Sequence, residues 1–158
     1  MSQWLSRRLQ YTSTSASTMI VDVVINQAIK LVKDFYLANG QIKTLHGWQH
    51  VHRVYQHAEQ AIQCHSPAIP STTATEIRLA ALLHDVDDSK YFPQHANYEN
   101  ARSLLTDTRT EGVPNVDVNV DSILEMIGWV SCSKNGNRVP PKVLQNLAYH
   151  FFVPLWSY

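Results

Sequence analysis

Two stretches of the sequence combine histidines and carboxylates at spacings that suit a metal ion. In "LAALLHDVDD" (79–88) an apolar run ends in His84 and Asp85, and Asp87 and Asp88 follow at once. Neighbouring residues diverge in mid-helix, but where a helix ends the backbone turns and both side chains can point the same way. An imidazole nitrogen and a carboxylate oxygen could then bind one ion, held by the apolar helix. The alternative is a capping Asp beside a partly exposed His.

The second stretch, "HGWQHVHRVYQH", places His46, His50 and His57 on one stripe with Arg53 close by. Positions three, four and seven apart coincide on a helix. A single His on an apolar face is usually a hydrogen-bonded core residue, whereas several beside an Arg favour a site. His46 and His50 have the spacing of helical zinc pairs. Gly47 stands where H-E-x-x-H needs Glu, which disfavours a metalloprotease.

Six segments carry apolar residues at helical spacing, and they must position these side chains. "Asn39-Gly40" predicts the end of the first helix, and a Ser71–Thr73 cap predicts the start of the third. Alternation of period two is confined to the short stretch 115–121. The sequence therefore predicts an all-α bundle of about six helices, over residues 19–40, 47–65, 71–86, 97–107, 120–133 and 142–152.

Composition predicts one globular domain. The 158 residues are 44% hydrophobic and 16% charged, and 13 Lys+Arg balance 13 Asp+Glu. No overall field attracts nucleic acid or an anionic membrane, so any attraction for phosphate is local. No apolar run approaches the ~18 residues of a membrane span. The two cysteines are far apart and outside any CxxC pattern, which predicts reduced thiols in a cytoplasmic protein.

The first 18 residues differ from the rest of the chain. They contain two Arg, many Ser and Thr, and no acid. We expect a disordered N-terminal tail at 1–18 ahead of a helical domain at 19–158, with an organelle transit peptide as the weaker alternative.

The blocks "HGWQHVHRV" and "ALLHDVDD" together resemble the HD-domain superfamily of metal-dependent phosphohydrolases. The signature of that superfamily is a lone His, a His-Asp pair ending another helix, and a distant Asp. The likeness to small uncharacterised HD proteins covers residues 40–157, through "DSKY", "NYENA" and "VSCSKNGN". It implies an HD-like helical bundle in which His50, His84 and Asp85 bind the metal.

The same resemblance implies the chemistry. A divalent transition metal (Mn, Fe, Co, Ni or Zn, with Mg as a further option) would activate water against a small phosphorylated molecule such as a nucleotide. Asp88 and Arg53 are the candidate catalytic residues: Asp88 would orient or deprotonate the water, and Arg53 would neutralise phosphate. The alternatives are a solvated Asp88 and an ordinary surface Arg53. Asp87 is expected in solvent.

Four further residues are candidates for substrate binding. His46 would either contact phosphate or support a metal ligand, Trp48 would stack on a base, and Lys90 and Lys134 would neutralise phosphate. The alternatives are a core position for Trp48 and surface charges for the lysines. His57 would support a ligand or lie in the core. "SCSKNGN" (131–137) is either a substrate loop or an ordinary turn.

The HD pattern also needs a late Asp, and here the sequence departs from it. "VPLWSY" aligns with the segment that carries this ligand, which puts Tyr158 in its place, and no acid follows Glu125. We expect a domain that is incomplete at its C-terminal end and has three protein ligands. The alternative function is a catalytically weakened or inactive HD-like binding or regulatory module. An exposed apolar segment would favour a homo-oligomer; it contains Phe151, Phe152, Leu155 and Trp156.

Overall fold

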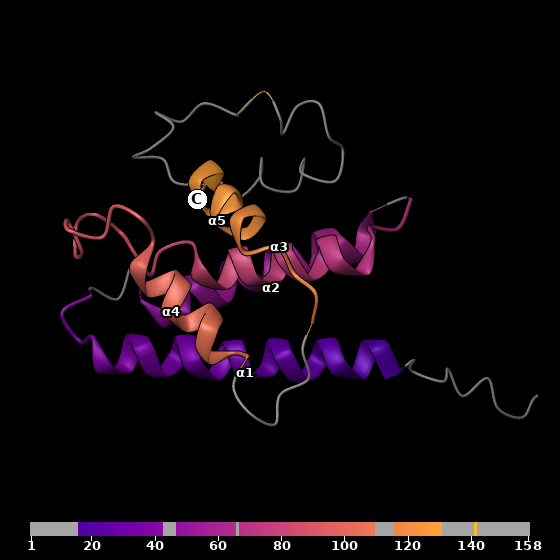
Figure 1. Cartoon of the computed structure of the whole chain (residues 1–158), viewed down its shortest axis with the longest axis horizontal. Coiled ribbons are helices and arrows are strands. Elements are labelled where there is room, and N and C mark those ends of the chain that lie inside the picture. Colours follow the sequence, from indigo (N-terminus) through magenta and orange to yellow (C-terminus); the bar gives the residue numbers. More distant parts are fainter. Residues whose placement is uncertain (1–15, 43–46, 66, 110–115, 131–140, 142–158) are drawn as a thin grey trace, which may run out of the picture.

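The computed structural model describes residues 16–42, 47–65, 67–109, 116–130 and 141, and this part of the chain is all helical (Figure 1). The all-α prediction is thereby confirmed. No helix in these ranges is both long enough and apolar enough to cross a membrane. The sixth predicted helix, 142–152, lies outside the described residues. The five helices are α1 (Ala16–Ala38), α2 (Trp48–Cys64), α3 (Ser71–Leu83), α4 (Glu99–Asp107) and α5 (Val120–Val130).

Two helix starts differ from the predicted ones. Helix α1 begins at Ala16, so it includes three residues of the segment expected to be a tail; residues 1–15 lie outside the described ranges. Helix α3 begins at Ser71, and its N-cap is Pro70, whose carbonyl accepts the Ala74 N–H at 2.9 Å without any side-chain cap. The extended backbone that proline favours therefore replaces the predicted Ser/Thr cap.

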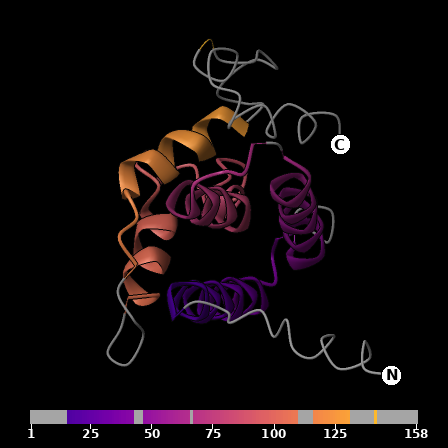
Figure 2. The same cartoon turned by 90° about the vertical axis from the view of Figure 1, so that its right-hand side faces the viewer.

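Helix α3 forms the centre of the bundle. Figure 2 shows it end-on in the middle, with α1, α2, α4 and α5 around it. The run Leu79–Leu83 is at most 2% exposed, because this part of the helix is apolar on all sides. The helix that ends in His84 is thus the most enclosed element of the described fold.

Helix α2 covers α3 with one face. Val51, Val54 and Ala58 are buried as the apolar stripe predicted, while Tyr55 and Ile62 lie half-buried at its edge. His50 precedes Val51 on the rim of this face. Its side chain is 23% exposed, so the ring borders the core while remaining within reach of solvent.

Polar side chains of α3 hold the neighbouring helices in place. The Glu76 carboxylate is only 7% exposed, and it accepts the Asn119 N–H at 2.9 Å and the Ser122 hydroxyl at 3.2 Å, at the N-terminus of α5. Two positions further along α3, on another face of the helix, Arg78 pairs with Glu59 of α2. A buried carboxylate at a helix N-terminus is stabilised by the helix dipole and by these hydrogen bonds.

Candidate metal centre

Three predicted ligand residues meet where α3 ends against α2. His84 is the C-cap of α3, Asp85 follows it in the turn, and His50 comes from the first turn of α2. The Nε2 atoms of the two histidines lie 3.1 Å apart, and each is 3.4 Å from Asp85 Oδ2. One donor atom from each of the three residues falls within 4.8 Å of the others, so this group could hold a metal ion.

The second ring nitrogen of His84 fixes which atom is free to bind. His84 Nδ1 lies 2.9 Å from the Ala81 carbonyl oxygen, one turn back on α3. A carbonyl can only accept, so Nδ1 carries the proton, and in the neutral ring Nε2 holds the lone pair. That lone pair is on the side of His50 and Asp85. Metal-binding histidines are oriented by a bond of this kind, so the residues fit a divalent cation.

The charges of His84 and Asp85 shift the pKa values of the two residues in opposite directions, so that each favours the charged form of the other. Burial by itself lowers the pKa of His84, but the negative charge and hydrogen bond of Asp85, the Ala81 carbonyl and the charge of Asp88 outweigh it and raise that pKa. Burial alone would raise the pKa of Asp85, but the charges and hydrogen bonds of His84 and His50 hold it well below its ordinary range. The carboxylate therefore stays ionised and calls for a positive partner, which is either a proton on imidazole or a cation.

These pKa directions predict that metal affinity falls with acidity. The raised pKa of His84 lies above its ordinary value of 6.5, so protons already compete for Nε2 above that pH. We expect the affinity for Zn²⁺ to fall as the pH is lowered from about 8 to about 6. Below the pKa of His84 in the folded protein, the fall should be about tenfold per pH unit for each proton that the metal displaces. Titration calorimetry at several pH values measures this, and a pH-independent affinity would contradict it.

The folding stability of the metal-free protein is expected to change with pH in the opposite direction: it falls as pH rises. A folded pKa raised above the unfolded value contributes stability that is complete below the unfolded pKa and is lost as pH rises through the folded pKa. For His84 that loss occurs above about pH 6.5. Thermal unfolding of wild type and His84→Asn, with a chelator present, measures this contribution. The stability advantage of wild type over the variant should shrink as the pH becomes more alkaline.

Asp87 is buried, which corrects the expectation that it faces solvent. Its side chain is 4% exposed, and it accepts the N–H groups of Asn100 and Ala101 at 2.9 Å and the His95 ring at 3.0 Å. The Asn100 amide in turn donates to the Val86 carbonyl at 2.7 Å. The first backbone N–H groups of a helix have no internal partner, and a carboxylate satisfies them. Asp87 thus joins the turn after His84 to the start of α4.

Asp88, the predicted water-activating residue, binds its own turn. Its Oδ1 accepts the Lys90 backbone N–H at 2.9 Å, and its carbonyl accepts the N–H groups of Tyr91 and Phe92 at 2.9 Å. The carboxylate is not part of the three-residue group, although its charge contributes to the raised pKa of His84. Its catalytic role stays a prediction.

The other predicted residues of α2 are spread around the helix. Arg53 is exposed, and so is His57, which excludes a core position for the latter. Trp48 is half-buried against the core, and its ring lies 5.2 Å from that of His52. The structure brings His50 alone from this helix into the candidate centre, because the neighbouring positions point to other faces.

Of the predicted substrate-binding lysines and the remaining histidine, the structure describes Lys90 alone. Lys90 is exposed, and its ammonium lies 5.8 Å from the centre of the Tyr91 ring. His46, Lys134 and the loop 131–137 fall outside the described residues, as does the apolar segment around Phe151.

A second group of possible ligands lies beside the first. Asp87, His95 and Glu99 also offer three ligand atoms within 4.8 Å of one another. Both Asp87 oxygens already accept backbone N–H groups of α4, and the Glu99 carboxylate accepts the Asn97 N–H at 3.2 Å. These carboxylates therefore serve to hold the start of α4. In the first group, by contrast, the donor atoms face one another.

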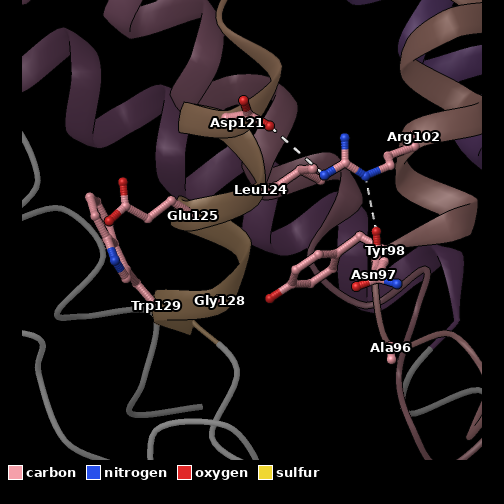
Figure 3. A pocket seen from close by; sticks show the side chains of 9 residues that line it. All are labelled: Ala96, Asn97, Tyr98, Arg102, Asp121, Leu124, Glu125, Gly128 and Trp129. Atoms are coloured by element: carbon pink, nitrogen blue, oxygen red, sulfur yellow. Dashed lines mark hydrogen bonds and ion pairs between the residues drawn. The ribbon is translucent and has the colours of Figure 1, made fainter.

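A separate open pocket of about 490 Å³ lies between α4 and α5 (Figure 3). Arg102 crosses it, 3.8 Å from Asp121 and bonded through Nε to the Asn97 carbonyl. Tyr98, at a left-handed φ of 59°, turns its hydroxyl toward Gly128, where a Cβ would lie only 3.0 Å away. None of the three candidate ligands lines this pocket, and its single cation is paired, so the candidate chemistry lies at the end of α3.

The comparisons with known proteins found one similar chain and no family. An uncharacterised protein of Acanthamoeba polyphaga mimivirus is 35% identical over 99 residues, covering 58% of this chain. The match spans about 40% of the length of that viral protein. No model of a known protein family matches the chain, and no solved structure matches it significantly. Function must therefore be argued from the site.

Proposed function

We propose that the chain is an HD-type, metal-dependent phosphohydrolase acting on a small phosphorylated molecule such as a nucleotide, in the cytoplasm. The observation that carries this proposal is the convergence of His50 Nε2, His84 Nε2 and Asp85 Oδ2 within 4.8 Å. His50 and His84 are 34 positions apart in sequence, and Asp85 follows His84 in the turn after α3. Two imidazoles and one carboxylate suit Mn²⁺, Fe²⁺, Co²⁺, Ni²⁺ or Zn²⁺, each of which would complete its coordination with water.

Each residue has a separate part in the proposed reaction. His50, His84 and Asp85 hold the ion, and Ala81 keeps the His84 ring in the binding tautomer. The ion supplies Lewis-acid chemistry, lowering the pKa of water and polarising a phosphoryl oxygen. Asp88, whose charge already affects His84, is the candidate for accepting a proton from water.

The number of protein ligands bears on which of two functions the centre serves. In the part of the chain that the structure describes, the group around His84 has three ligands and no fourth. Three protein ligands are typical of catalytic zinc, so the number permits catalysis. It also leaves room for the second candidate function, an HD-like module that binds a metal and a phosphorylated ligand without hydrolysing a phosphate ester.

Metal content and ester hydrolysis together test the proposal. The full chain would be loaded separately with Mn²⁺, Fe²⁺, Co²⁺, Ni²⁺, Zn²⁺ or Mg²⁺ and given p-nitrophenyl phosphate, bis(p-nitrophenyl) phosphate and a panel of nucleotides. We expect about one ion per chain and hydrolysis that needs the ion. A chain that binds no metal would overturn both candidate functions, whereas stoichiometric metal without hydrolysis of any ester would favour the binding module.

A further inference from the structure

Tyr36 carries a hydroxyl group that the described structure leaves without a partner. The side chain is on the last turns of α1, and the residue is 7% exposed. Among the buried side-chain nitrogen and oxygen atoms of the described residues, the Tyr36 oxygen is the one with no hydrogen bond. Such groups are rare in folded proteins because an unsatisfied buried hydroxyl destabilises the fold. Its position therefore calls for an explanation.

The end of α1 lies against the turn that carries the candidate ligands. Phe35 packs edge-on against Tyr36 at 5.4 Å between ring centres, and lies 5.9 Å from Phe92. The Phe92 N–H is bonded to the Asp88 carbonyl, three residues beyond Asp85. Figure 1 shows this end of α1 and the loop after α3 at the same end of the bundle.

Burial, together with the charges around Tyr36, keeps its hydroxyl protonated. Burial raises the pKa of its hydroxyl, and the negative charge of Asp85 raises it further, followed by the charges of Asp88 and Asp87. These carboxylates belong to the turn against which the end of α1 packs, through the contact of Phe35 with Phe92. A phenol that stays neutral at every ordinary pH can serve there as a hydrogen-bond donor.

We propose that the Tyr36 hydroxyl donates a hydrogen bond to an oxyanion, with inorganic phosphate as the simplest case, bound at the His50–His84–Asp85 centre. This inference rests on the proposed function, and it adds a residue from α1 that selects the ligand. Carboxylates near the centre repel a free anion, so an anionic ligand needs the ion and neutral donors around it. A hydroxyl without a protein partner meets that need, because the incoming oxygen satisfies it.

Replacing Tyr36 by phenylalanine removes this hydroxyl alone and tests the inference. In the metal-free protein we expect no loss of thermal stability, because the deleted group has no partner to lose. The affinity for Mn²⁺ should be unchanged. The affinity of the Mn²⁺-loaded protein for inorganic phosphate should fall by about tenfold or more, as expected for a lost hydrogen bond to a charged group. Titration calorimetry measures both affinities.

A matched control comes from α2. Tyr55→Phe makes the same change at a half-buried tyrosine whose pKa is raised by burial and by the neighbouring Glu59, and it should leave both affinities unchanged. Wild-type protein that binds no Mn²⁺ overturns the metal centre and the role of Tyr36 with it. Equal phosphate affinities of wild type and Tyr36→Phe overturn the inference alone. A metal-free Tyr36→Phe protein that is clearly destabilised, or that loses Mn²⁺ affinity instead, also overturns it.

Discussion

Replacing His84 by asparagine is expected to remove metal binding from the chain. The asparagine amide can still donate to the Ala81 carbonyl, but it lacks the Nε2 lone pair that faces His50 and Asp85. Loss of a residue that only supports a ligand weakens metal binding by about tenfold to a hundredfold. We therefore expect loss of a ligand to exceed about a hundredfold. Titration calorimetry with Zn²⁺ or Mn²⁺ measures the change, and any metal-dependent ester hydrolysis should disappear with it.

The control for His84→Asn is His52→Asn. His52 is a half-buried histidine of α2 whose ring lies beside Trp48 and outside the three-residue group. Its replacement should leave metal affinity within about twofold of wild type, because no ligand atom is lost. If both variants kept wild-type affinity, the ion would have to bind elsewhere, and the assignment of His84 would be wrong.

Replacing Asp87 by alanine is expected to destabilise the fold by about 3 kcal/mol. The change removes two hydrogen bonds to the N-terminus of α4 and one to His95, and leaves buried N–H groups unsatisfied. Asp87→Asn should destabilise the fold less than Asp87→Ala, because one acceptor oxygen survives. It should still destabilise the fold, because the charge that favours a helix N-terminus is lost. Urea unfolding measured by circular dichroism gives the free energies of unfolding for these variants.

The neighbouring carboxylate provides the comparison for Asp87. Asp88→Ala deletes one bond to the Lys90 backbone N–H in an exposed turn, and we expect a loss of less than about 1 kcal/mol. A loss for Asp88→Ala as large as that for Asp87→Ala would contradict the structural assignment. The Asp87 variants should also bind metal less tightly, because this carboxylate connects the turn after His84 and Asp85 to α4.

Much of the helical fold could be predicted because helices are encoded locally. Apolar residues at positions such as Val51, Val54 and Ala58 repeat with the period of a helix, and Asn39-Gly40 ends one. The ends were less predictable. Pro70 rather than a Ser or Thr is the N-cap of α3, and α1 extends back to Ala16, since several local conformations compete at a helix terminus.

The sequence by itself determined the all-α class and singled out His50, His84 and Asp85 as possible ligands of one ion. Helical periodicity was sufficient for the class, while the choice of these three residues came from the resemblance of two sequence blocks to HD-domain proteins. Only the tertiary structure decided what the residues around them do. Adjacent Asp87 and Asp88 look alike in sequence, yet the Asp87 side chain is buried against the start of α4, whereas the Asp88 carboxylate accepts the backbone N–H of Lys90 in the same turn.

The tertiary structure also decided that Arg53 and His57 are exposed, and that the end of α1, which carries Tyr36, packs beside the turn after α3 through Phe35 and Phe92. The physical reason is the same in each case. A helical period determines which side chains share a face, but the turn after Leu83 has no period, and a contact between α1 and that turn depends on how the whole bundle packs. Local patterns therefore specify the helices, while long-range packing specifies the surroundings of the ligands.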